Sequence, residues 1–187
     1  MMTTFDIEAL MPKREKLAVQ LRVAVLGGGS FGTAMANLAA RNGCDTTMWI
    51  RDEKAALEMQ QTHCNKRYLP DFQLEDTLGF SCHLEEVVPN KDIILLAIPS
   101  HSYREVLKKI APMITGQVIV SLTKGIEAET FCLMSDIIQQ ELPEVPFGVL
   151  SGPNLAKEIV AGMPAATVIA SSSDALRNAV QNALHSA

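Results

Sequence analysis

Three glycines stand at the spacing of a loop that binds phosphate groups. Gly27, Gly29 and Gly32 directly follow the apolar run 23–26 and precede a helical pattern. In such a loop the first glycine permits a tight turn, the second lets the backbone approach a pyrophosphate, and the third lets the helix lie close to the strand. The amide groups of Ser30 and Phe31 would face the anion at the positive end of the helix. The pattern therefore predicts a dinucleotide site, although any tight turn from strand to helix can use glycines.

A second candidate residue stands where such sites hold the adenosine ribose. An acidic residue is usual about 20 residues past the first glycine, at the end of the second strand. Asp45 comes too early, at the start of that strand, and Arg51 occupies the end. Arg51 can cover the adenine ring or meet a 2′-phosphate, or it is an ordinary solvated charge. The choice between NAD and NADP stays open.

Polar residues at the ends of later strands could hold a substrate. Lys124 follows the apolar run 118–122, so its ammonium group is expected at the carboxyl edge of the sheet, where it suits a phosphorylated ligand. The alternative is an exposed lysine at a strand end. Asn154 precedes a helix and could be a plain N-cap. His101 also follows a strand, but we assign it a structural role.

These residues need a frame of alternating strands and helices. Apolar, β-branched runs predict strands at 22–26, 46–50, 93–98, 118–122, 148–150 and 167–170, with a weaker one at 80–82. Helical periodicity fits 31–41, 53–62, 103–110, 130–141, 155–160 and 175–185. This order predicts an α/β fold, a doubly wound parallel sheet of the Rossmann type. We expect one domain over 21–187, preceded by a lead-in at 1–20 that does not resemble a signal peptide.

Composition excludes several classes of function. The net charge of −5 provides no basic field for nucleic acid, and no apolar run approaches the roughly 20 residues that span a bilayer. The four cysteines form no C-x-x-C pair and show no metal-ligand spacing with His63, His83 or His185. A reduced, cytoplasmic protein without a metal is expected.

Five segments carry a resemblance to a known family. They share one order along the chain and read G-G-G-S-F-G-T-A (27–34), N-K-R-Y-L-P (65–70), P-S-H-S (99–102), S-L-T-K-G-I-E (121–127) and S-G-P-N-L-A-K-E (151–158). Over residues 21–172 the chain resembles the N-terminal domain of NAD(P)-dependent glycerol-3-phosphate dehydrogenases. The resemblance implies an oxidoreductase that interconverts dihydroxyacetone phosphate and sn-glycerol 3-phosphate, in glycerophospholipid and carbohydrate metabolism.

The same resemblance implies roles for individual residues. It places cofactor beside Ala156, substrate beside Gly152 and Asn154, and both beside Lys124. The family's proton-transferring lysine lies in a second, helical domain within an A-L-K-N segment, which this sequence does not contain. The catalytic residue is therefore expected beyond Ala187, and the chain is expected to be an incomplete enzyme.

Two other interpretations compete with this one. The chain could come from another hydroxyacid dehydrogenase with a similar cofactor domain, against which the T-K-G-I-E and S-G-P-N-L-A segments argue. It could also be a stand-alone NAD(P)-binding module without turnover. The sequence leaves a homodimer open.

Overall fold

One sheet organises the chain. The computed structural model describes residues 20–185, so the lead-in expected at 1–20 lies outside the described residues except for Gln20. Seven strands form the sheet: β1 (Arg22–Leu26), β2 (Asp45–Trp49), β3 (Gly79–Ser81), β4 (Ile93–Leu96), β5 (Val118–Ser121), β6 (Phe147–Ser151) and β7 (Val168–Ala170).

The strand order confirms the doubly wound fold. The order is β3-β2-β1-β4-β5-β6-β7, and the first six strands are parallel. The chain reverses its winding direction between β1 and β4, where Val23 pairs with Thr46 on one side and with Ile93 on the other. One feature of the expected parallel sheet is wrong, because β7 runs antiparallel to β6.

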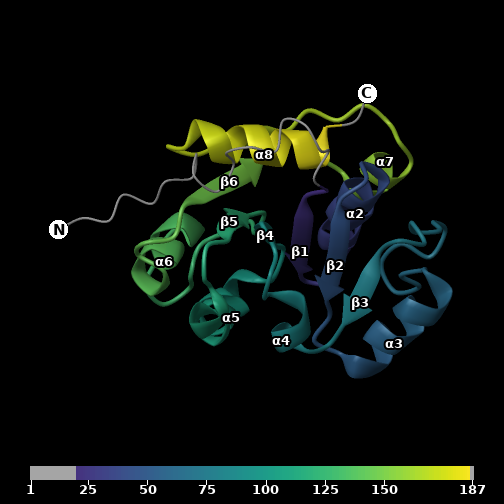
Figure 1. The fold of residues 1–187 in the computed structure, drawn as a ribbon, viewed down its shortest axis with the longest axis horizontal. Helices are drawn as coiled ribbons and strands as arrows, with labels where there is room; N and C mark the ends of the chain where they lie inside the picture. Colours follow the sequence, from purple (N-terminus) through teal and green to yellow (C-terminus); the bar gives the residue numbers. More distant parts are fainter. Residues whose placement is uncertain (1–19, 186–187) are drawn as a thin grey trace.

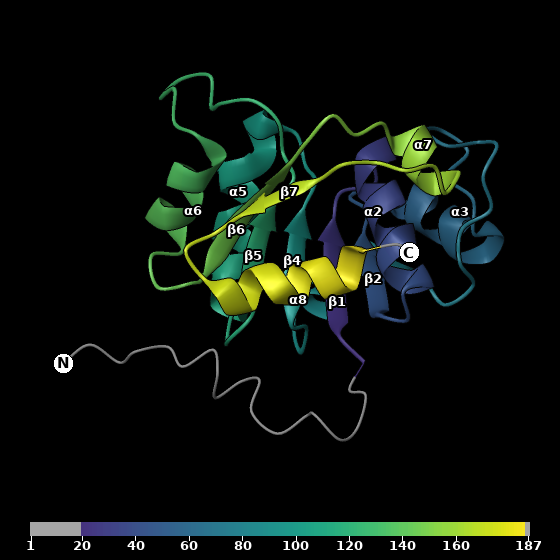
Figure 2. The same ribbon diagram turned by 90° about the horizontal axis from the view of Figure 1, so that it is seen from above.

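Helices cover both faces of the sheet (Figures 1 and 2). Along β1, Val23 and Val25 pack toward α2, α7 and α8, whereas Ala24 and Leu26 pack toward α4, α5 and α6. This alternation with period 2 explains why the central strands are apolar throughout. The helices are α2 (Ser30–Arg41), α3 (Glu53–Thr62), α4 (Leu84–Val87), α5 (Ser100–Ile110), α6 (Met134–Glu141), α7 (Ala156–Val160) and α8 (Asp174–Leu184), with a 3₁₀ turn at Ala111–Met113.

Local chemistry sets several helix ends. Ser173 accepts a hydrogen bond from the Leu176 amide and so caps the start of α8. The helix expected at 130–141 instead begins at Met134, because Phe131 has a left-handed φ of 58° and Ile126 bridges to Leu133. The single turn α4 has no counterpart among the expected helices. Within residues 20–185, every helix is too short or too polar to cross a bilayer.

Candidate functional site

The glycine loop between β1 and α2 is pressed against the backbone of its neighbours. Gly27 has a φ of +127°, and a Cβ there would lie 2.3 Å from the carbonyl oxygen of Ala97. A Cβ on Gly32 would lie 2.3 Å from the carbonyl oxygen of Gly27. Because both obstacles are backbone atoms, the turn and the close packing of α2 depend on glycine at these two positions.

The amino end of α2 is open and unopposed by negative charge. A Cβ on Gly29, the N-cap, would meet nothing within 4 Å. No side chain caps the helix and its first turn holds no acidic residue. The Thr33 amide bonds to the Gly29 carbonyl, so the preceding amides of the first turn have no partner inside the helix. These features fit the pyrophosphate of a dinucleotide.

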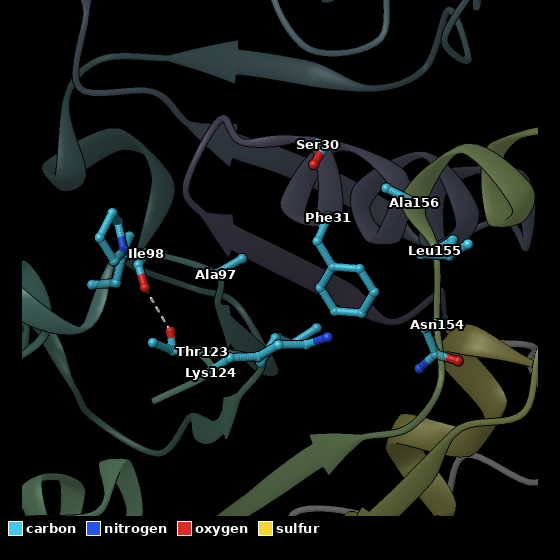
Figure 3. Close-up of a pocket in the computed structure, with 11 residues that line it drawn as sticks. Ser30, Phe31, Ala97, Ile98, Thr123, Lys124, Asn154, Leu155 and Ala156 are labelled. Carbon is cyan, nitrogen blue, oxygen red and sulfur yellow. Dashed lines mark hydrogen bonds between the residues drawn. The ribbon is translucent and has the colours of Figure 1, made fainter. Parts of the chain in front are cut away.

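A cleft of about 400 Å³ opens beside this helix end (Figure 3). Its walls are the segments that follow β1, β4, β5 and β6, so it lies at the carboxyl edge next to the point where the winding reverses. Ligands of doubly wound folds bind in this position. The lining residues are Ser30, Phe31, Ala97, Ile98, Pro99, Leu122, Thr123, Lys124, Asn154, Leu155 and Ala156.

The structure brings together five of the residues singled out from the sequence. Ser30, Phe31, Lys124, Asn154 and Ala156 all line the cleft. In Figure 3 the side chain of Lys124 extends from one side toward the Phe31 ring, and Asn154 lies on the opposite side. One cation, one buried amide and a row of free backbone donors therefore surround the same space.

The lining does not include the other five predicted residues, which are the three loop glycines described above, Gly152 and Arg51. Gly152 is closely enclosed by its neighbours, because a Cβ there would lie 2.5 Å from the Ala166 carbonyl oxygen and 3.0 Å from Asn154 Nδ2. Arg51 is exposed beyond the end of β2. The pKa of Glu105 on α5 is lowered by its hydrogen bond with Lys109 and, to a smaller extent, by the charge of Arg51. Arg51 is therefore close enough to α5 for its charge to act on Glu105.

Asn154 is a buried amide without a partner. It is 7% exposed, and neither Oδ1 nor Nδ2 has a hydrogen-bond partner in the described part of the chain. The N-cap interpretation is wrong, because Leu155 is the N-cap of α7 and no side chain caps that helix. Burying an unpaired amide is costly, which makes Asn154 ready to bind a polar ligand in the cleft.

The apolar and backbone parts of the lining could not be recognised from the sequence. Thr123 Oγ1 donates to the Ile98 carbonyl oxygen over 2.8 Å, which ties the end of β5 to the end of β4 (Figure 3). Only the strand pairing brings these residues together, so their types alone gave no signal. The lining residues that were not predicted as site residues are Ala97, Ile98, Pro99, Leu122, Thr123 and Leu155.

Arg104 anchors the loop that carries Lys124. From α5, its Nε and Nη2 atoms donate to the two carboxylate oxygens of Glu127, each over 2.8 Å. Its Nη1 atom donates to Glu141 at the end of α6, and Thr130 also donates to Glu127. The hydrogen bonds from Arg104, followed by that from Thr130, lower the pKa of Glu127 from 4.5 to about 2. This bidentate ion pair holds residues 123–133 to two helices.

Replacing Arg104 with glutamine should change how stability depends on pH. A carboxylate with a lowered pKa stabilises the fold above its unfolded pKa of 4.5, and that stabilisation is lost as the pH falls toward about 2. The melting temperatures of the parent and R104Q should therefore differ most above about pH 5 and converge toward about pH 2. Circular dichroism melts across this range measure the difference. Lys109→Gln, which breaks an exposed pair with Glu105 on the same helix, should match the parent closely. A constant R104Q offset at every pH would contradict the prediction.

Other parts of the described chain offer less chemistry. A hollow of about 640 Å³ lies between α2, α7, α8 and β7, but none of the buried unpartnered polar atoms belongs to its lining. His101 is exposed on α5 and does not line the cleft. Within residues 20–185, His, Cys, Asp and Glu form no group of three that could hold a metal ion. The cleft beside α2 is therefore the candidate site.

Comparison with known sequences points to one family. The family model described as the N-terminus of NAD-dependent glycerol-3-phosphate dehydrogenase matches residues 22–177. A glycerol-3-phosphate dehydrogenase [NAD(P)+] of Acinetobacter baumannii (strain SDF) is 71% identical over 167 residues, which are 89% of this chain and 47% of that protein. The enzyme of the same name from Psychrobacter cryohalolentis is 60% identical, over 95% of this chain and 41% of that protein. The chain thus spans about half the length of the curated relatives it matches.

Solved structures agree with the sequence match. A glycerol-3-phosphate dehydrogenase from Coxiella burnetii superposes with a TM-score of 0.85 at 33% identity. The match covers 90% of this chain and 52% of that one. The fold of this chain therefore matches about half of that longer chain.

Proposed function

The chain belongs to the NAD-dependent glycerol-3-phosphate dehydrogenase family and matches its N-terminal part, and we propose on this basis that it binds NAD or NADP. Its cleft forms the cofactor side of a site where dihydroxyacetone phosphate and sn-glycerol 3-phosphate are interconverted. The observation that carries the proposal is the meeting of three features in one cleft. These are the uncapped amino end of α2, the Lys124 ammonium group and the unpartnered Asn154 amide. Together they offer donors to a pyrophosphate and to a phosphorylated polyol or ketone.

We assign each residue a part in this proposal. The glycine loop and the first turn of α2 bind the pyrophosphate, Arg51 faces the adenosine end, and Lys124 contacts both cofactor and substrate. The residues proposed to bind cofactor are Gly27, Gly29, Ser30, Phe31, Gly32, Arg51, Lys124 and Ala156, and those proposed to bind substrate are Lys124, Gly152 and Asn154. They belong to a Rossmann domain over 21–187.

The bound nicotinamide would supply or accept the hydride in this reaction. The chain's own side chains bind and orient. Lys124 offsets the negative charge of the substrate phosphate, and Asn154 donates and accepts at the polar groups beside it. We assign proton transfer to no residue of these 187. From composition we further propose a cytoplasmic protein that does not bind nucleic acid, and the sequence leaves a homodimer open.

Calorimetry tests the proposal directly. NADH should bind the chain, and dihydroxyacetone phosphate should bind the NADH complex more weakly when Lys124 is replaced by methionine. The effect should be about tenfold or more, as expected for losing a hydrogen bond to a charged group. Absence of NADH binding would refute the proposed function. Binding of dihydroxyacetone and of its phosphate with equal affinity would instead favour a different substrate for the same cofactor domain.

Arg51 should affect the choice of cofactor. Both NADH and NADPH are expected to bind, because the position usually held by a carboxylate carries a cation that accommodates a 2′-phosphate. Arg51→Ala should weaken NADPH by about tenfold or more and NADH much less, since only NADPH loses a charged hydrogen bond. Fluorescence titrations of both cofactors measure this, with Lys54→Ala as a control that removes an exposed charge three residues away. An unchanged ratio of the two affinities would remove Arg51 from the cofactor site.

A further inference from the structure

Asn65 lies beneath the glycine loop although it is distant in sequence. It belongs to the segment 63–78 between α3 and β3, and it is 3% exposed. Its Nδ2 atom donates to the Gly28 carbonyl oxygen over 3.0 Å and to Thr33 Oγ1 over 2.8 Å. Its Oδ1 atom accepts from the Tyr68 amide over 3.2 Å. These bonds fix which end of the Asn65 amide is Nδ2 and which is Oδ1, because the Gly28 carbonyl can only accept and the Tyr68 amide can only donate.

The bond to the Gly28 carbonyl controls the orientation of one peptide group in the glycine loop. The Gly28 carbonyl and the Gly29 amide belong to the same trans peptide and point in opposite directions. Since Asn65 holds the carbonyl toward the protein interior, the Gly29 amide points to the open side of the loop. That amide has no hydrogen-bond partner in the described part of the chain. It joins the free amides at the start of α2.

A second buried asparagine holds the same segment without touching the loop. Asn37 Oδ1, one turn beyond Thr33 on α2, accepts from the Glu75 amide over 2.7 Å. Segment 63–78 is thus fastened to α2 through Asn65 and through Glu75, which also pairs with Arg41, and of these links only Asn65 reaches the glycine loop. Asn37 therefore separates the docking of the segment from the support of the loop.

We infer that Asn65 is a positioning residue for cofactor binding, because it fixes the Gly28–Gly29 peptide so that its amide faces the pyrophosphate. The inference rests on the proposed function. Neither a carboxylate nor an aliphatic side chain can replace Asn65, because the Gly28 carbonyl needs a donor at this position.

Asn65→Asp tests the inference, because aspartate keeps the shape and the Tyr68 bond but cannot donate when ionised. Its NADH dissociation constant should rise about tenfold or more relative to the parent. Asn37→Asp also buries a carboxylate but still accepts from Glu75, so its affinity should stay within about twofold. Titrations are run well below the lowest melting temperature of the set. Hydrogen exchange without cofactor should be faster in N65D alone at the hydrogen-bonded amides of Gly27 and Thr33, which flank the loop.

Each result decides between loop support and general stability. Equal weakening by N65D and N37D, or normal exchange and affinity in N65D, would overturn the role of Asn65. If N65D does not fold, Asn65→Ser supplies the test, because its hydroxyl is too short to reach Gly28 and it adds no charge. Failure of the parent to bind NADH would refute the proposed function itself, which the Asn65 variants cannot do.

Discussion

Gly32→Ala is expected to destabilise the protein by about 2 kcal/mol or more, the cost of forcing extra volume into a packed site. Helix propensity alone would favour alanine over glycine by roughly 0.5–1 kcal/mol, so a net loss must come from tertiary contact. The contact is the Gly27 carbonyl oxygen, 2.3 Å from the added Cβ, with the Ala97 Cβ at 3.0 Å. Urea unfolding followed by circular dichroism measures the change. Unchanged or increased stability would show that α2 can move away from the loop at little cost.

Substitutions at Gly29 should have the opposite effects, because they should preserve stability and weaken cofactor binding. A Cβ on Gly29 meets nothing within 4 Å, so Gly29→Ala and Gly29→Val should remain folded. The added carbons occupy the space assigned to the pyrophosphate. Gly29→Val should therefore weaken NADH by about 100-fold, corresponding to the loss of two hydrogen bonds to a charged group. Parent-like NADH affinity in a folded Gly29→Val protein would exclude the loop as the phosphate site.

The fold could be predicted because its signals are local. The strands are short apolar runs, and the turn before α8 holds a serine cap that acts within three residues. The direction of β7 could not be predicted, since an edge strand of three residues pairs either way without changing its own sequence pattern. The late start of α6 depends on the left-handed backbone conformation of Phe131. This conformation is rare for a phenylalanine, so the sequence does not predict it.

The site was predicted only where residue chemistry marks it. Glycine spacing and the strand-end positions of Lys124 and Asn154 point to the cleft, because the carboxyl edge of a parallel sheet gathers the residues that follow its strands. The residues that hold the site in place, Asn65 and Arg104, could not be found in this way. Asn65 and Gly28 are 37 residues apart, and Arg104 and Glu127 are 23 apart. An asparagine in a loop or an arginine on a helix has many ordinary partners, so only the folded chain selects these.

The largest expected effect concerns turnover, because the chain should bind cofactor but hardly catalyse the reaction. Lys124 is the single ionisable residue among those that line the cleft in the described part of the chain, and the curated relatives are about twice as long. The 187 residues should therefore bind NADH but reduce dihydroxyacetone phosphate at a rate near background. A positioned acid or base is typically worth about 10² to 10⁴ in rate, and orientation of the substrate between two walls adds to this.

A chimera provides the matched comparison for this last prediction. Joining the chain within α8 to the remaining half of the Acinetobacter baumannii enzyme should give turnover at least about 100-fold above that of the 187 residues. The affinity for NADH should be similar in the chimera and in the 187 residues, because both contain the same glycine loop. Absorbance of NADH in steady state measures the rates. Equal turnover by the two proteins would mean that the 187 residues already contain the group that moves the proton, and Lys124 would be the first residue to replace. An inactive chimera that binds both ligands would favour a binding module without turnover.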